Sequence, residues 1–402
     1  MDGTLLAILS GRDRPGVTAA LFDALRHTRT VVLDMEQLVV RGRLILAVLL
    51  GVDAGDVGEV RQVVHGVASQ AGMEVETLPG AREQVVRAPQ RIHITVMGAP
   101  LAPGAVADLA REVADRGWNI DRIRRIAAYP VTAVVFEGSG EDIADLRRAL
   151  SEKSRALGVD VAVQHAGLSR RGQRLVVMDV DSTLIQDEVI DLLADRAGTL
   201  GEVAAITESA MRGDIDFAES LRARVATLRG LPVSALDEVV AEVRLTPGAR
   251  TLCRTLRRLG FHLCLVSGGF EEIVSPVARD LDVDRIRANR LETEDGRLTG
   301  RVLGSIIDRA GKRAALEEFA AEFGVPLERT IAIGDGANDL DMLEAAGLGV
   351  AFNAKPAVRA AADTSLNVPY LDSVLYLLGV TREEIEEADA ADGITARGPN
   401  SY

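Results

Sequence analysis

The chain has 402 residues, of which 47% are hydrophobic, enough for more than one domain with a core of its own. Its formal net charge of -14 argues against a general nucleic-acid or anionic-membrane surface, so we expect neither partner, and an anionic substrate needs a local positive site. The two cysteines, Cys253 and Cys264, are expected to be reduced core thiols. There is no basic leader segment and no run of the roughly 18 apolar residues that a membrane span needs, so we expect a cytoplasmic protein.

Residues 1–165 contain a diffuse internal repeat. Thr4–Ser10 can be laid on Ile92–Gly98, and Pro15-Gly16 on Pro103-Gly104. Each copy continues with a segment of helical period, two alternating strands, a second helix and a last strand. The order βαββαβ, present twice, predicts two small α+β domains with antiparallel sheets.

This half resembles tandem ACT domains, the ferredoxin-like regulatory modules that bind amino acids. The similarity rests on a short turn, GRDRPG, where Pro and Gly let backbone N–H groups approach a ligand carboxylate at a helix start. A plain helix start is the alternative. The second copy, Gly98–Gly104, lacks the Asp and both Arg side chains, so the first copy is favoured. The resemblance implies an amino-acid effector, with L-serine expected, held by Gly11, Asp13, Arg14, Pro15 and Gly16.

After a polar connector, strand-length apolar runs alternate with helical patterns and predict a parallel, doubly wound α/β sheet of Rossmann type. The runs are Arg174–Val180, Phe261–Ser267, Thr330–Gly334 and Gly349–Phe352. Between the first two, Glu188–Arg244 is mostly amphipathic and too long for a simple crossover. We therefore expect a helical cap inserted after the first strand.

The expected domain limits follow from these patterns. The acidic stretch Thr381–Asp392 is predicted to be a frayed tail rather than an interaction element. The limits are 1–82 and 88–165 for the two repeats, 166–173 for a linker, 174–385 for the α/β domain with its cap at about 188–246, and 386–402 for a flexible acidic tail.

The apolar run Leu175–Met178 ends in two carboxylates, Asp179 and Asp181. Ligands of open α/β sheets bind beyond the carboxyl ends of strands, so both stand at a predicted active-site edge. Their mutual repulsion needs compensation, which a divalent cation would supply. Asp179 is then a candidate nucleophile and Asp181 a candidate general acid and base. Taken alone, the same residues also suit a strand-to-turn boundary that caps the next helix.

Three later segments carry related chemistry. Ser267-Gly268-Gly269 offers a hydroxyl and backbone amides to phosphoryl oxygens, and Lys312 can neutralise charge on a transferring group. The segment IAIGDGANDL, residues 331–340, forms a second acidic strand end. Oxygen ligands without His or Cys favour Mg²⁺, whereas the five scattered histidines do not suggest zinc. The loop lacks the ending of a nucleotide P-loop, so nucleotide binding is not supported.

The ordered set DVDST, SGG, Lys312 and GDGAND resembles the haloacid dehalogenase superfamily. A closer similarity, to phosphoserine phosphatases, covers roughly residues 174–380 and includes the cap segments DSTLIQDEVIDLLA and MRGDIDFAESLRARVATLRGLP. With two ACT-like domains in front, the chain resembles the long, mycobacterial-type form of that family.

The resemblance implies Mg²⁺-dependent hydrolysis of O-phospho-L-serine to L-serine and phosphate, the last step of L-serine biosynthesis. Asp179 would form an aspartyl-phosphate, while Asp181 would protonate the serine oxygen and later activate water. The resemblance also implies that Mg²⁺ is bound by Asp179, the Asp181 main-chain carbonyl and Asp335, with Asp339 in support, and that the phosphoryl group is bound by Ser267, Gly268 and Lys312. Glu188 would bind the α-amino group of the substrate and Arg224 its α-carboxylate. Further substrate contacts would come from Met211, Phe217 and Asn338.

Other interpretations stay open. Glu188 and Arg224 also suit an ordinary ion pair on a helix surface. The chain could be a broader phosphatase or a phosphotransferase acting on other phosphomonoesters or phosphoproteins, or an amino-acid sensor with an inactive phosphatase half. By analogy with paired ACT modules we expect a homodimer formed chiefly through residues 1–165.

Overall fold

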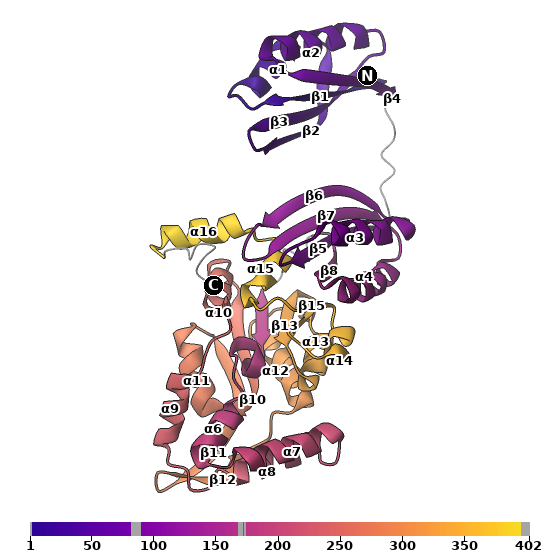
Figure 1. Ribbon diagram of the computed structural model, residues 1–402. Helices are drawn as coiled ribbons and strands as arrows, with labels where there is room; N and C mark the ends of the chain where they lie inside the picture. Colours follow the sequence, from indigo (N-terminus) through magenta and orange to yellow (C-terminus); the bar gives the residue numbers. More distant parts are fainter. Residues whose placement is uncertain (1, 82–89, 168–171, 173, 395–402) are drawn as a thin grey trace. The chain divides into compact units, whose positions relative to one another are not determined.

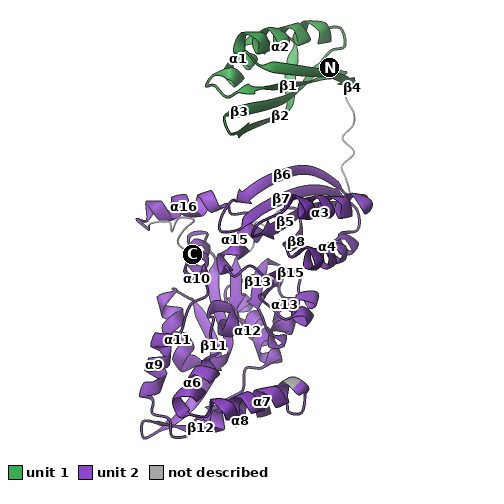
Figure 2. Cartoon of the chain, in the orientation of Figure 1, with its two compact units in different colours: residues 1–87 green, residues 88–402 purple. Residues whose placement is uncertain are grey.

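A computed structural model describes residues 2–81, 90–167, 172 and 174–394, except for the side chain of Met211. The chain divides into two compact units, Met1–Arg87 and Ala88–Tyr402 (Figure 2). The linker expected at 166–173 lies largely outside the described residues. Among the described residues, no helix has the length and apolar character needed to cross a membrane.

The first unit is a four-stranded antiparallel sheet with two helices (Figure 1). The side chains of β1 alternate between buried and half-buried, and Leu5, Ala7 and Leu9 pack in one core with residues of both helices. The sheet order is β2-β3-β1-β4. Its elements are β1 (Gly3–Arg12), α1 (Val17–Leu25), β2 (Thr30–Val40), β3 (Arg43–Val52), α2 (Val57–Ala71) and β4 (Glu74–Ala81).

The second unit begins with the same order of elements, so the predicted βαββαβ repeat is confirmed. Buried side chains of β5, among them Ile92, Ile94 and Val96, form a core with both helices. The elements are β5 (Gln90–Gly98), α3 (Pro103–Asp115), β6 (Asn119–Ala127), β7 (Thr132–Gly140), α4 (Ile143–Leu157) and β8 (Asp160–His165).

The rest of the second unit is the predicted doubly wound sheet, with strands in the order β12-β11-β10-β9-β13-β14-β15. Strand β9 (Leu175–Met178) is buried on both faces: Val176 and Met178 enter one core, and Leu175 and Val177 another. This is why it appears in the sequence as a continuous apolar run. The other strands are β10 (His262–Phe270), β11 (Arg285–Glu294), β12 (Arg297–Leu303), β13 (Thr330–Gly334), β14 (Leu348–Phe352) and β15 (Thr364–Leu366).

Helices cover both faces of this sheet, in keeping with the two separate cores. They are α10 (Ala249–Arg258), α11 (Glu271–Asp280), α12 (Arg309–Glu322), α13 (Leu340–Ala345), α14 (Pro356–Ala361) and α15 (Val374–Leu377), with short turns η2 (Leu327–Arg329), η3 (Ala337–Asp339) and η4 (Leu371–Ser373).

The expected cap follows the wide turn η1 (Val180–Leu184) and consists of α6 (Val189–Ala197), α7 (Leu200–Arg212), α8 (Phe217–Ala226) and α9 (Ser234–Glu242). Its two connections to the sheet lie together, because Ile185 pairs with Leu245. The β11–β12 hairpin, which is not among the predicted strands, also reaches the cap: the N–H of Gly230 donates to Leu298 O at 2.8 Å.

The second repeat and the α/β domain share one sheet. Strand β15 pairs antiparallel with β8 through Thr364 and Ala162, which makes a continuous sheet of 11 strands. Buried Asp160 strengthens this junction, since it accepts hydrogen bonds from Asn367 N at 2.8 Å, Asn367 Nδ2 at 2.7 Å and Val368 N at 3.1 Å. The sequence patterns do not reveal this fusion.

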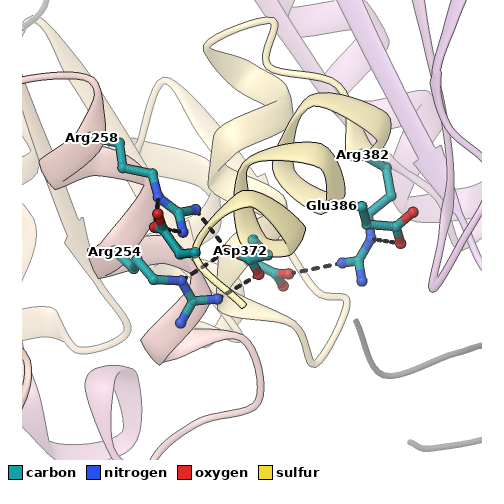
Figure 3. A network of polar contacts seen from close by, with 7 residues as sticks. Arg254, Arg258, Asp372, Arg382 and Glu386 are labelled. Carbon is teal, nitrogen blue, oxygen red and sulfur yellow. Dashed lines mark hydrogen bonds and ion pairs between the residues drawn. The ribbon is translucent and has the colours of Figure 1, made fainter. Parts of the chain in front are cut away.

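Where a flexible acidic tail is expected from residue 386, the structure has a helix, α16 (Arg382–Ala391) (Figure 3). Asp389 accepts hydrogen bonds from Arg254 and Arg258 of α10, at 2.9 and 2.6 Å. Arg382 contacts Asp372 at 3.4 Å and Glu386 at 2.8 Å. The acidic residues therefore pair with basic side chains that are distant in sequence, and a composition-based prediction misses these partners.

Candidate active site

The three central strands of the sheet, β10, β9 and β13, deliver the predicted chemical groups to one edge. They are parallel neighbours, so their carboxyl ends meet. Ser267 lies near the end of β10, Asp179 directly follows β9, and Asp335 directly follows β13. Segments far apart in the sequence are thus brought together as predicted.

Asp179 is 4% exposed and contacts the ammonium group of Lys312, with Nζ 2.8 Å from Oδ1. Lys312 is fully buried and also lies 2.7 Å from Asp339 Oδ1. Burial raises the pKa of Asp179 well above its ordinary range, and the charge of Asp339 adds to this while Lys312 opposes it. Burial disfavours the charged form of Lys312, but the two carboxylates outweigh it and raise its pKa. One buried cation therefore serves two carboxylates.

Asp181 is held from two sides. Its Oδ2 accepts a hydrogen bond from Ser267 Oγ at 3.0 Å, and its Oδ1 accepts one from Val189 N at 2.8 Å. Burial raises its pKa, which favours the protonated form that a general acid needs. The next residue, Ser182, has a φ of 55°, a left-handed conformation that costs a residue with a side chain about 1 kcal/mol and turns the chain towards the cap.

The Ser267-Gly268-Gly269 turn is shaped by close packing. A Cβ atom on Gly269 would lie 2.8 Å from Asp181 Oδ2, so a side chain there would displace the Asp181 carboxylate. The Ser267 hydroxyl accepts a hydrogen bond from Gly269 N at 2.7 Å. Asn289, for which the sequence predicts no role, donates from its Nδ2 to Gly268 O at 2.8 Å. It also accepts from Ile307 N at 2.8 Å, so this buried amide in a strand anchors the turn.

Three carboxylates, those of Asp179, Asp335 and Asp339, place ligand oxygens within 4.8 Å of one another. An all-oxygen donor set of this kind fits a hard cation such as Mg²⁺. Burial, with the charge of Asp339, raises the pKa of Asp335 to about 6. A bound cation would offset this unfavourable environment for the ionised carboxylate. Both oxygens of Asp339 are engaged, one by Lys312 and one by Gly336 N at 2.9 Å, which suits a supporting position.

Two cap residues of opposite charge complete the site. Glu188 precedes α6 and accepts a hydrogen bond from Ser182 Oγ at 2.8 Å. Partial burial raises the pKa of Glu188 to about 7, and the charge of Asp181 contributes. Burial lowers the pKa of Arg224 in α8, although the negative charge of Glu188 opposes this shift. The buried Nε of Arg224 has no hydrogen-bond partner among the described residues, so the protein leaves this donor unpaired.

The other predicted substrate contacts divide into described and undescribed ones. Phe217 reaches the phosphoryl-binding turn, since its Cζ lies 3.1 Å from where a Cβ on Gly268 would be. Asn338 packs against the acidic loop, because its side-chain oxygen lies where a Cβ atom on Gly336 would be. The side chain of Met211 lies outside the described part of the structure.

The predicted effector residues form an exposed turn in the first unit. Gly11 ends the buried part of β1, and a Cβ there would meet Met73 Cγ at 3.1 Å. Asp13 N donates to Gly42 O at 2.8 Å, and Gly16 has a φ of 94° directly before α1. Arg14 and Pro15 are exposed between them.

Comparison with known proteins agrees with this architecture. Residues 176–344 match the haloacid dehalogenase-like hydrolases, and residues 3–77 and 92–164 each match an ACT domain. The chain is 56% identical over 397 residues to a phosphoserine phosphatase of Streptomyces coelicolor, covering 98% of this chain and 97% of that one. It is 52% identical over 393 residues to one of Mycobacterium tuberculosis, covering 97% and 96%.

Solved structures show the same arrangement over most of the chain. A probable phosphoserine phosphatase from Vibrio cholerae, in unliganded form, has a TM-score of 0.58 and 33% identity over 73% of this chain and 88% of that one. A haloacid dehalogenase-family hydrolase from Salmonella enterica serovar Typhi has a TM-score of 0.64 and 27% identity, covering 72% and 98%. The chain belongs to the phosphoserine phosphatase family of haloacid dehalogenase-like hydrolases, with two ACT domains preceding the hydrolase.

Proposed function

We propose that this chain hydrolyses O-phospho-L-serine to L-serine and phosphate, the last step of L-serine biosynthesis, in the cytoplasm. At one edge of the sheet, the buried Asp179–Lys312 pair lies together with Asp181 and with the oppositely charged Glu188 and Arg224. This arrangement is the main observation behind the proposal. Membership of the family supports the same substrate.

In the first step Asp179 attacks phosphorus. Val180 N and Lys312 both bind its Oδ1, at 2.7 and 2.8 Å, which leaves Oδ2 for the new O–P bond. The bond between phosphorus and the serine oxygen breaks, and protonated Asp181 gives its proton to that oxygen. The products of this step are L-serine and an aspartyl-phosphate at Asp179.

In the second step Asp181, now a carboxylate, takes a proton from water as the water oxygen attacks phosphorus. The Asp179–phosphorus bond breaks, which releases phosphate and restores both aspartates. The hydrogen bonds from Ser267 Oγ and Val189 N keep Asp181 in one orientation for both proton transfers.

Mg²⁺ would be held by Asp179, the Asp181 main-chain carbonyl and Asp335, with Asp339 in support. When bound, it supplies positive charge to a phosphoryl oxygen. Ser267, Gly268 and the Lys312 ammonium hold the remaining phosphoryl oxygens.

Glu188 and Arg224 give the site its preference for an amino acid. The carboxylate binds the substrate ammonium group and the guanidinium binds its α-carboxylate, using a donor that the protein leaves unpartnered. Phe217 and Asn338 complete the pocket around the serine, and the family resemblance alone adds Met211 as a further contact.

The test compares phosphate release from O-phospho-L-serine and from an aryl phosphate that lacks both recognition groups, with Mg²⁺ or with EDTA. Arg224→Met should lower kcat/KM for phosphoserine about 100-fold and change the aryl phosphate only a few-fold, since a charge-assisted contact contributes about 1.5–3 kcal/mol. Arg222→Met, an exposed arginine on the same helix, is the matched control and should behave like the unmodified chain.

Equal losses on both substrates would contradict the role of Arg224. Equal turnover of both substrates by the unmodified chain would mean a broad phosphatase, and turnover unaffected by EDTA would contradict the metal assignment.

We further propose that the turn Gly11–Gly16 binds an amino-acid effector, L-serine, and that the chain forms a homodimer through residues 1–165. The edge strand β2 supports the dimer, because Met35 and Leu38 are 54% and 57% exposed. L-serine should weaken activity in the unmodified chain, and Arg14→Met should lessen that response. A monomeric mass in solution would contradict the dimer.

A further inference from the structure

A cavity of about 320 Å³ lies in the second unit where the second ACT domain meets the hydrolase. Gly98, Ala99 and Arg155 line it from the ACT side, and Arg359 and Val368 from the hydrolase side. Its volume is at the lower end of the range of about 300–1,000 Å³ that is usual for ligand pockets. None of the described active-site residues lines it, so it is separate from the catalytic centre.

The cavity is locally positive within an acidic chain. Among the described residues that line it, the charged ones are Arg155, Arg359 and Asp160. The carboxylate of Asp160 is already occupied, since both its oxygens accept hydrogen bonds from Asn367 and one also accepts from Val368. The guanidinium groups therefore have spare capacity for a negative group.

Arg359 has a specific unused donor. Its Nη1 donates to Asn367 Oδ1 at 2.9 Å, but its buried Nε has no hydrogen-bond partner among the described residues. Buried N–H groups in native proteins are almost always paired, so Arg359, which lines the cavity, has hydrogen-bonding capacity that the protein leaves unused. A carboxylate is the acceptor that guanidinium geometry matches best in a small organic molecule.

The remaining walls are partly apolar. Met97, Val159 and Pro369 lie alongside the two arginines. Such a mixed lining suits an anion that carries a short aliphatic body better than a fully polar anion such as phosphate, which would leave the apolar walls without contacts.

We propose that this cavity binds a small organic carboxylate, with its carboxylate on Arg155 and Arg359 and its aliphatic body against Met97, Val159 and Pro369. The second ACT domain has lost the Asp and Arg side chains of the first at the matching turn, Gly98–Gly104, and here that turn contributes its first residues to a pocket shared with the hydrolase. The ligand would touch the hydrogen-bonded chain Arg359–Asn367–Asp160, which joins β8 to the segment after β15. This proposal does not depend on the substrate of the catalytic site.

The test is isothermal titration of the full chain with 4-methylpentanoate, and with 4-methylpentanamide as a neutral molecule of nearly the same shape. We expect saturable binding of the carboxylate and at least ten-fold weaker binding of the amide. Arg155→Met and Arg359→Met should each weaken carboxylate binding at least ten-fold. Arg329→Met, an exposed arginine of the same unit outside the cavity, should leave it unchanged.

Two further variants keep the result decisive. Arg14→Met must retain binding, because loss there would place the ligand at the turn of the first ACT domain and overturn the proposal. Arg359→Lys keeps the charge and should retain part of the affinity, and if Arg359→Met fails to fold, Arg155→Met carries the test. Absence of saturable binding, equal binding of the amide, or tighter binding of inorganic phosphate would each overturn the proposal.

Discussion

Two clusters of charged side chains in the hydrolase half have opposite electrostatics. Around Asp179, a single ammonium group, that of Lys312, lies within 2.8 Å of two carboxylates, and burial raises the pKa of Asp179. Around Asp389, two guanidinium groups surround one carboxylate. Burial works against the charge of Asp389, yet the hydrogen bonds from Arg254 and Arg258 outweigh it and hold the pKa below its ordinary range.

The difference shows what separates a reactive cluster from a structural one. The Asp179 cluster is fully buried and short of positive charge, so it favours a bound cation. The Asp389 cluster is fully paired and partly exposed, so its role is structural: it fixes α16 on α10 (Figure 3). Similar residue types thus serve catalysis or stability according to burial and charge balance.

The largest expected effect comes from Asp179→Asn. The neutral amide cannot form the aspartyl-phosphate, so kcat should fall at least about a thousand-fold. The unfolding temperature should not fall, because the change removes a buried carboxylate whose ionised form is disfavoured. Phosphate release and thermal unfolding measure the two effects, and retained turnover would mean that the nucleophile is another group.

Asp389→Asn should give the opposite result, unchanged kcat with lower stability. Losing the charge-assisted bonds to Arg254 and Arg258 should cost about 2 kcal/mol, which corresponds to about 4–8 °C in the unfolding temperature of the hydrolase. Asp392→Asn is the matched control: its side chain is 58% exposed and, among the described residues, forms an ion pair only with Arg258, so its effect should stay below about 2 °C.

The sign of the pH dependence sharpens this second test. Because the pKa of Asp389 is lowered by folding, its contribution is present at neutral pH and is lost as the pH falls through the folded-state pKa. The unmodified chain and Asp389→Asn should therefore differ most near neutral pH and converge in acid. A difference that grows in acid would contradict the assigned ion pairs.

The smallest effect concerns Glu188, whose pKa of about 7 places its titration within the working range. Protonation below that pH removes the charge that binds the substrate ammonium group. The ratio of kcat/KM for phosphoserine to that for an aryl phosphate should therefore fall about ten-fold between pH 8 and pH 6, as each unit of titration below the pKa costs about a factor of ten. In Glu188→Gln the ratio should be low and independent of pH; a retained slope would assign the titration to another group.

The two ACT copies illustrate how far a sequence pattern reaches. The spacing of their apolar residues predicts both folds, and both are confirmed. It does not predict that β8 of the second copy pairs with β15, because that contact joins Ala162 and Thr364 across some 200 positions of chain. The strands that meet there, DVAVQH and TSL, are short and carry no motif.

The sequence by itself determined the elements whose physics is local: the buried run of β9, the turns at Ser267 and Asp335, and the helical period of the cap. The order of acidic and Gly-rich strand ends also predicted which residues would meet, since parallel strands bring their carboxyl ends to one edge. The motifs therefore placed the predicted site residues on the right strand ends, whereas nothing in the sequence points to Asn289, which holds the turn through contacts with Gly268 and Ile307.

Tertiary structure alone decided the rest, because charge pairing and cavities arise from residues that are neighbours only in space. The same acidic composition that suggests a flexible tail becomes helix α16 once Arg254 and Arg258 lie beside it. The pKa values of Asp179 and Glu188 follow from burial and from nearby carboxylates, which no local pattern encodes. The cavity between Arg155 and Arg359 likewise exists only because the second ACT domain and the hydrolase share a sheet.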